Sequence, residues 1–142
     1  MSTARQIDKD YVATGKVRVV IKNRAGLGAE SQPAAEAALC AGDQGKYWEF
    51  SDKLSEALMA GNRAGFNKDS YKALAGELGL NAAAFGQCVD GGKYARQVKA
   101  ETDESTRLGI TSTPTFLVNG TKIIGAQPYQ TFQVAIEAEL GK

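Results

Sequence analysis

The strongest nucleophiles in this 142-residue sequence are the thiols of two cysteines, Cys40 and Cys88. They are far apart in the sequence and form no Cys-x-x-Cys motif, and two cysteines are too few for a four-cysteine zinc site or an iron–sulfur cluster. The sequence has no histidine, which excludes Ser-His-Asp and Cys-His catalysis and most zinc sites. The remaining possibilities are lysine or carboxylate chemistry, a thiol function, or no chemistry.

Charge and hydropathy give no sign of a nucleic acid or a membrane as partner. The sequence has 17 Lys and Arg against 16 Asp and Glu, a net charge of +1. No segment has the roughly 18 consecutive apolar residues of a membrane helix, and the first ten residues lack the apolar core of a secretory signal. Translated as written, the chain is expected to be cytoplasmic, without a metal or small-molecule cofactor.

Other polar and aromatic groups have structural explanations. Asp103 and Glu104 are neighbours on a predicted helix, so they point in different directions and cannot flank one substrate. Tyr47, Trp48 and Phe50 lie on a helix with a clear apolar stripe, and we interpret them as core residues rather than a binding surface.

The order of predicted elements indicates an α+β domain with a helical insertion. A helix over Thr3–Thr14 ends at Gly15, and the β-branched residues that follow predict a strand over Lys16–Ile21 and then a loop over 22–32. Helices are then predicted over Pro33–Gly42, Gln44–Ala60 (capped by Asp43), Lys68–Leu78, a short segment begun by Asn81, and a longer segment that ends near Leu108.

The last third predicts a β-hairpin and a closing helix. Asn119-Gly120 between Thr115–Val118 and residues 121–124 is typical of a two-residue type I′ turn. Pro128 is expected to open a helix that turns Phe132, Ile136 and Leu140 inward.

The motif before the hairpin indicates a family. Leu108–Phe116 (LGITSTPTF) places a proline at the entrance of a strand, and this resembles the cis-proline loop of DsbA-like thioredoxin-fold proteins. The similarity continues, in the same order, through residues 11–20 (YVATGKVRVV), 32–50 (QPAAEAALCAGDQGKYWEF), 78–81 (LGLN) and 85–88 (FGQC). It implies one thioredoxin-like domain of DsbA type over 1–142, built from residues 3–32 and 109–142 with a helical insertion over 33–108.

The resemblance also implies roles for four residues. In such proteins the cis-proline loop presents backbone groups to an extended polypeptide, which makes Thr113 and Pro114 the candidate substrate-binding residues. An alternative is that Pro114 only shapes the strand entrance. The resemblance also implies a structural disulfide between Cys40 and Cys88, because some DsbA-like relatives carry one at these two helices. Two buried reduced thiols and a reactive, cycling pair are the alternatives.

The sequence departs from the family at its first helix. Redox-active members carry Cys-x-x-Cys at the N-terminus of this helix, after a central strand, and residues 1–4 contain neither. A sheet without that strand has unpaired backbone groups. Three arrangements would satisfy them: direct pairing of the 17–21 strand with the 115–118 strand, a homodimer, or an extended peptide added by β-augmentation.

The function expected from these observations is a redox-inactive domain that associates with itself or binds an extended polypeptide near the cis-proline loop. The alternative is a truncated fragment of a thiol–disulfide oxidoreductase. As given, the chain is not expected to be an enzyme. The resemblance also implies a periplasmic or extracellular location, in contrast to the cytoplasmic one that the literal N-terminus suggests.

Overall fold

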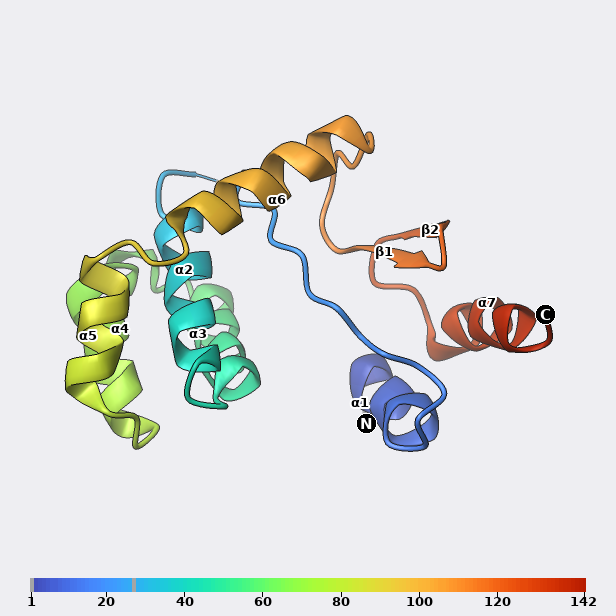
Figure 1. The fold of residues 1–142 in the computed structure, drawn as a ribbon, viewed down its shortest axis with the longest axis horizontal. Helices are drawn as coiled ribbons and strands as arrows, with labels where there is room; N and C mark the ends of the chain where they lie inside the picture. Colours follow the sequence, from blue (N-terminus) through green and yellow to red (C-terminus); the bar gives the residue numbers. More distant parts are fainter. Residues whose placement is uncertain (1, 27) are drawn as a thin grey trace. The chain divides into compact units, whose positions relative to one another are not determined.

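The structure is a computed structural model that describes residues 2–26 and 28–142 (Figure 1). The expected loop over 22–32 includes residue 27, which lies outside the described residues, as does residue 1 of the expected N-terminus. The elements are α1 (Thr3–Ile7), the π-helical η1 (Asp8–Val12), α2 (Ser31–Gly42), α3 (Tyr47–Met59), the 3₁₀ turn η2 (Arg63–Gly65), α4 (Lys68–Glu77), α5 (Ala82–Asp90), α6 (Ala95–Arg107), β1 (Thr115–Val118), β2 (Thr121–Ile124) and α7 (Tyr129–Leu140).

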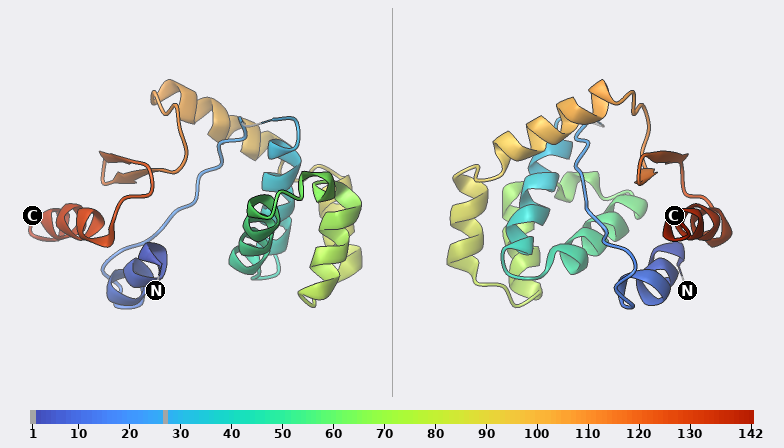
Figure 2. Two further views of the ribbon diagram at one scale, coloured as in Figure 1. Left: turned by 180° about the vertical axis from the view of Figure 1, so that it is seen from behind. Right: turned by 45° about the vertical axis from the view of Figure 1, so that its right-hand side comes forward.

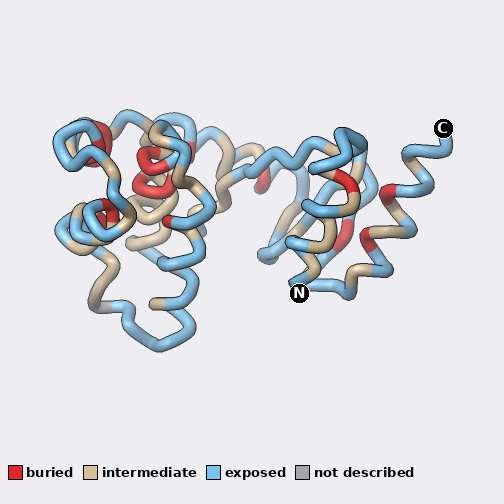
Figure 3. The backbone as a smooth tube through the Cα atoms, turned by 90° about the horizontal axis from the view of Figure 1, so that it is seen from below, coloured by how far each residue is buried: buried red, intermediate tan, exposed pale blue. Residues whose placement is uncertain are grey.

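The chain forms two compact units. The helical unit comprises Asn23–Glu104, and the hairpin unit comprises Met1–Lys22 together with Ser105–Lys142. Figure 3 shows buried backbone segments in the helices of the helical unit and in the helices of the hairpin unit. Each unit therefore has its own apolar cluster.

Three aromatic rings form the centre of the helical unit. Phe50 of α3 lies 6.4 Å from Tyr71 of α4 and 5.6 Å from Phe85 of α5, measured between ring centroids, and all three are at most 1% exposed. Small residues of α2, such as Ala37 and Ala41, pack around them and are fully buried. These contacts join four helices across a shared apolar face.

The helix starts in this unit follow the sequence, with one exception. The Asn67 side chain accepts a hydrogen bond from the Ser70 amide at the start of α4, and Asn81 does the same for Ala84 at the start of α5, the role predicted for Asn81. The predicted cap at Asp43 is wrong. Residues 43–45 form a turn in which Gly45 has a φ of +74°, and α3 begins only at Tyr47.

The prediction that all three neighbouring aromatics of α3 are core residues is also wrong for one of them. Phe50 is fully buried and Tyr47 packs partly against the core, but Trp48 is 55% exposed. The helical stripe that buries Tyr47, Phe50 and Leu54 turns Trp48 away from the other helices.

The hairpin unit is held together by packing between its first and last helices. Tyr11 of η1, Ile123 of β2, and Phe132 and Ile136 of α7 form its buried cluster. Phe132 and Ile136 thus face inward as predicted, whereas Leu140, one turn later, is 43% exposed, contrary to prediction. The helix ends there, beyond the reach of the small cluster.

The predicted hairpin is confirmed. Thr115 pairs with Ile124 and Val118 with Thr121 in an antiparallel register, and the turn residues Asn119 and Gly120 have φ angles of +46° and +96°. Positive φ at both positions is what a type I′ turn requires, and Asn-Gly provides it at little cost. The described residues form a two-stranded sheet together with helices, which confirms the α+β class and the incomplete sheet.

The predicted strand over Lys16–Ile21 does not form in the described chain. The Lys16 and Val17 amides both donate to the Tyr11 carbonyl, and the following residues run as an extended segment without a ladder partner (Figures 1 and 2). The β-branched side chains favour an extended backbone, as the sequence indicated. A strand also needs a neighbour, and β1 pairs only with β2.

The buried hydroxyl of Tyr71 leads to a first prediction. Among the described residues it has no hydrogen-bond partner, and burial, followed by the charge of Glu30, raises the pKa of Tyr71 to about 12. Because an unpartnered buried hydroxyl loses its hydration without compensation, Tyr71→Phe should stabilise the fold by about 1 kcal/mol in urea unfolding. Tyr94→Phe is the matched control and should destabilise, since the Tyr94 hydroxyl donates to Asp43. A loss of stability in Tyr71→Phe would contradict this explanation.

Candidate functional site

The two cysteines form a disulfide that joins α2 to α5. The Cys40 and Cys88 sulfur atoms are 2.03 Å apart across a sequence separation of 48 residues, with a Cα–Cα distance of 5.8 Å. The side chains are 1% and 9% exposed. The disulfide implied by the resemblance is therefore present, and neither thiol is free.

A charged cluster lies beside the disulfide. The Asp43 carboxylate accepts hydrogen bonds from the Lys93 ammonium, at 2.6 Å, and from the Tyr94 hydroxyl, and it lies 3.9 Å from the Cys88 sulfur. The hydrogen bonds from Lys93 and then Tyr94 hold the pKa of Asp43 below its ordinary value, and the bond to Asp43 raises the pKa of Lys93. Cys40, Cys88, Asp43 and Lys93 line one shallow depression of the surface.

This arrangement stabilises the ionised forms of Asp43 and Lys93. Asp43 is ionised at neutral pH and engaged by two donors, so it is a weak general base. The sulfur next to it already belongs to a disulfide and is not a nucleophile. The described residues contain no group of three or more His, Cys, Asp or Glu side chains that could hold a metal ion.

The hairpin unit contains a second polar cluster that sequence reasoning missed. The Tyr11 hydroxyl donates to Glu137 at 2.7 Å, and the Tyr129 hydroxyl donates to Asp10 at 2.6 Å. The bond to Glu137, followed by burial, raises the pKa of Tyr11, and the bond to Asp10 does the same for Tyr129. These two hydrogen bonds join η1 to α7. The partners in each bond are more than 100 residues apart, so no sequence motif could have indicated the contact.

The Thr113–Pro114 loop leads directly into β1. Its peptide bond is cis, and both side chains are exposed. The Pro114 carbonyl accepts a hydrogen bond from the Gly125 amide at 2.8 Å, and the Thr115 hydroxyl donates to the Ser112 carbonyl at 2.7 Å. These bonds fix the loop at the entrance of the strand, so that β1 continues directly from it.

One edge of the hairpin has unpaired backbone groups. In an antiparallel pair the backbone groups of alternate residues face the partner strand. The Gly125–Pro114 bond therefore places Phe116 and Val118 on the paired side, and the amides and carbonyls of Thr115 and Leu117 on the open side. No residue in 2–26 or 28–142 outside the hairpin bonds to them in the structure. Leu117 is 47% exposed.

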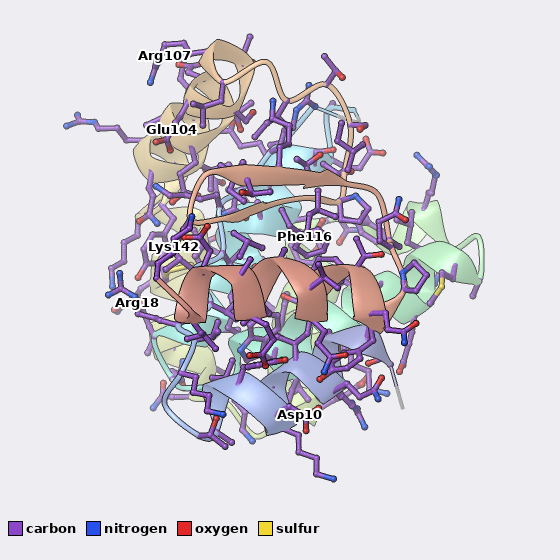
Figure 4. All side chains as sticks on the ribbon, turned by 90° about the vertical axis from the view of Figure 1, so that its right-hand side faces the viewer. Asp10, Arg18, Glu104, Arg107, Phe116 and Lys142 are labelled. Atoms are coloured by element: carbon purple, nitrogen blue, oxygen red, sulfur yellow. A yellow bond between two sulfur atoms is a disulfide. The ribbon has the colours of Figure 1, made fainter. Side chains whose placement is uncertain are left out.

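The other edge of the hairpin is protected. On β2, the Gln127 side chain donates to the Ile124 carbonyl at 2.9 Å, and Lys122 donates to the Leu108 carbonyl at 3.1 Å. A lysine on an edge strand is a common device against unwanted pairing. The side chain of Phe116 lies on the face of β1 opposite to Leu117. Its ring packs edge-on against Phe132, with 4.8 Å between the ring centroids, between the hairpin and α7 (Figure 4).

The geometry thus brings Cys40 and Cys88 together in the helical unit and places Thr113 and Pro114 next to an open strand edge in the hairpin unit. A family model described as Thioredoxin matches residues 2–138. The chain belongs to the thioredoxin family. Its fold is the thioredoxin-like α+β arrangement that the sequence predicts, with an incomplete sheet.

This thioredoxin-family chain is also similar to part of a much longer protein. It is 28% identical over 106 residues to "Na(+)/H(+) antiporter NhaA 1" of Salinispora arenicola (strain CNS-205). The match covers 75% of this chain and 16% of that relative. None of the helices described for this chain is long and apolar enough to cross a membrane.

The disulfide should contribute strongly to stability. By closing a 48-residue separation it restricts the unfolded chain, and the loop-entropy relation gives a contribution of about 4 kcal/mol. The double variant Cys40→Ala/Cys88→Ala should therefore lose about that much unfolding free energy in urea titration, and dithiol-reduced wild-type protein should behave similarly. A change below about 1 kcal/mol would show that the disulfide does not constrain the helical unit.

The Asp43 cluster predicts a pH dependence. Because the folded protein lowers the pKa of Asp43, the ionised form contributes stability above the ordinary carboxyl pKa, and this contribution is lost as the pH falls through the folded value. Asp43→Asn should therefore be less stable than wild type at neutral pH, with the difference shrinking in acid. Urea unfolding at about pH 7 and about pH 2.5 measures this. An equal difference at both pH values would contradict the assignment.

Proposed function

We propose that this thioredoxin-family chain is a non-catalytic domain of DsbA type that binds an extended polypeptide, either from another protein or from a second copy of itself. The binding site is the open edge of β1 where it leaves the Thr113–Pro114 loop. The observation that carries the proposal is the pair of outward backbone positions at Thr115 and Leu117, next to a protected β2 edge.

The chemistry of the site favours binding by β-augmentation. An extended chain laid along β1 would pair with the outward amides and carbonyls, which supplies affinity without a specific sequence. The half-exposed side chains of Phe116 and Leu117, at 39% and 47%, offer apolar contacts to alternate residues of the added strand. Thr113 and Pro114, both exposed, directly precede Thr115 and would lie at one end of such a chain.

The absence of redox activity is the second part of the proposal. Thiol–disulfide exchange needs an accessible thiolate, and both cysteines of the chain are buried in one disulfide. We assign Cys40 and Cys88 a structural role within a helical insertion over 33–108, and the binding role to the remainder, 3–32 and 109–142.

The match to a small part of a longer protein supports a role as a module. A domain that makes up a minor share of another chain works next to other polypeptide segments, which fits a site for an extended strand.

Binding can be tested with a permanently unfolded protein, reduced and carboxymethylated serum albumin, as the probe. Wild-type chain should bind it, and Leu117→Pro should not, because proline removes the outward amide. Ile124→Pro is the matched control on the protected edge, opposite Thr115 in the register, and should bind as wild type does. The pair Leu117→Lys and Ile124→Lys repeats the comparison without a backbone change.

Each pair of variants should be compared by fluorescence anisotropy of the labelled albumin, after circular dichroism has shown that the variants fold. Equal binding by the Leu117 and Ile124 variants, or no binding by wild type, would overturn the proposed site.

The alternative function is thiol–disulfide exchange through Cys40 and Cys88. The observation that favours it is the position of Cys88 at the depression next to the Lys93 ammonium, which could stabilise a thiolate after reduction. The proposed function predicts no reduction of insulin by the chain with dithiothreitol beyond the uncatalysed rate. Turnover that disappears in Cys40→Ala/Cys88→Ala would establish the alternative instead.

A further inference from the structure

Residues 18–21 form an extended segment that has no pairing partner among the described residues of its own copy. Upstream, the amides of Lys16 and Val17 are bonded to the Tyr11 carbonyl. Within the described chain, residues 18–21 make no backbone hydrogen bond. The side chains of Val19, Val20 and Ile21 are 50%, 59% and 38% exposed. Three consecutive exposed β-branched residues in an extended backbone are well suited to join a sheet.

The sequence of this segment has the two-residue alternation of a half-buried strand. Val17, Val19 and Ile21 share one face, and Val17 already packs in the apolar cluster of the hairpin unit. Arg18 lies on the opposite face, together with Val20. A sheet that covered the first face would leave the arginine in water.

Both ends of the segment are held by hydrogen bonds. Its first end is fixed by the Tyr11 carbonyl. Directly after it, the backbone and side-chain amides of Asn23 donate to Glu101 at 2.8 Å, and the Ala25 amide donates to Thr102 at 3.0 Å. Within the hairpin unit, residues 18–21 do not pair with β1, so the segment and the β1 edge are both open to a second copy.

We propose that two copies of this chain associate by reciprocal strand addition, with residues 18–21 of each copy pairing along the open β1 edge of the other. The inference rests on the proposed function, because it uses the same edge, and it identifies a second copy as the occupant when no other polypeptide is bound. Val19 and Ile21 would lie on the face of Phe116 and Val118, and Arg18 and Val20 on the outer face with Leu117.

The exchange satisfies unpaired groups on both sides. In each copy, the backbone groups of Thr115 and Leu117 would pair with residues 18–21 of the other copy. The backbone groups of residues 18–21 would gain partners in the same step. The arrangement is reciprocal, so two copies use all of the donor segments and acceptor edges and further growth stops. Other extended polypeptides would have to displace the partner segment, which makes self-association a competitor for the same edge.

The native disulfide allows a direct test, because the chain has no free cysteine. The test uses the register in which Val20 lies opposite Leu117 on the outer face, at a distance that a disulfide can span. Val20→Cys and Leu117→Cys proteins are mixed in equal amounts and oxidised with glutathione disulfide. Val134→Cys, on the 71% exposed Val134 of α7, replaces Leu117→Cys in the control mixture.

Mass spectrometry should detect the mixed Val20→Cys/Leu117→Cys dimer at about ten times the level of the control dimer, since pairing raises the local thiol concentration. Sedimentation velocity should show wild type and Val134→Lys as dimers, and Val20→Lys and Leu117→Lys as monomers. Equal crosslinking in both mixtures, or a wild-type monomer at high concentration, would overturn the exchange.

The test separates the exchange from the proposed function. A monomeric wild type that binds carboxymethylated albumin in a Leu117-dependent way would overturn only the exchange. A monomer that does not bind albumin would overturn both. A dimer whose formation Val20→Lys leaves unchanged would show that the copies meet through a different surface.

Discussion

The structure of the hairpin unit depends on the need of backbone amides and carbonyls for partners. A two-stranded sheet has two edges, and here only one of them is protected, by Lys122 and by the Gln127 side chain on the Ile124 carbonyl. The other edge presents Thr115 and Leu117 directly after the Thr113–Pro114 loop. The backbone groups of residues 18–21 are also unpaired. The proposed exchange would satisfy this segment and the β1 edge together.

The helical unit has a different role in this account. Its ring cluster of Phe50, Tyr71 and Phe85 and the Cys40–Cys88 disulfide fix four helices together, and the Asp43 cluster places ionised groups at the rim of the disulfide. All of these features stabilise the unit and none supplies a reactive thiol. In the proposed function, this disulfide serves stability and the sheet edge of the hairpin unit serves binding.

Local signals in the sequence predicted what depends on local structure. Asn119-Gly120 fixed the hairpin and its register, and Asn81 fixed a helix start, because turns and caps depend on a few adjacent residues. The prediction of a strand over 16–21 was wrong because a strand needs a neighbouring strand to pair with, and the local sequence does not determine whether one is present. Trp48 and the Tyr11–Glu137 pair were missed because exposure and long-range contacts are set by tertiary packing.

Amide hydrogen exchange at different protein concentrations tests the central claim, an open β1 edge that a second strand covers. The account predicts that the Phe116 and Val118 amides are protected at every concentration, because β2 pairs with them. The Thr115 and Leu117 amides should exchange rapidly in dilute protein and become protected as the concentration rises. Protection of all four amides that does not change with concentration would contradict the account.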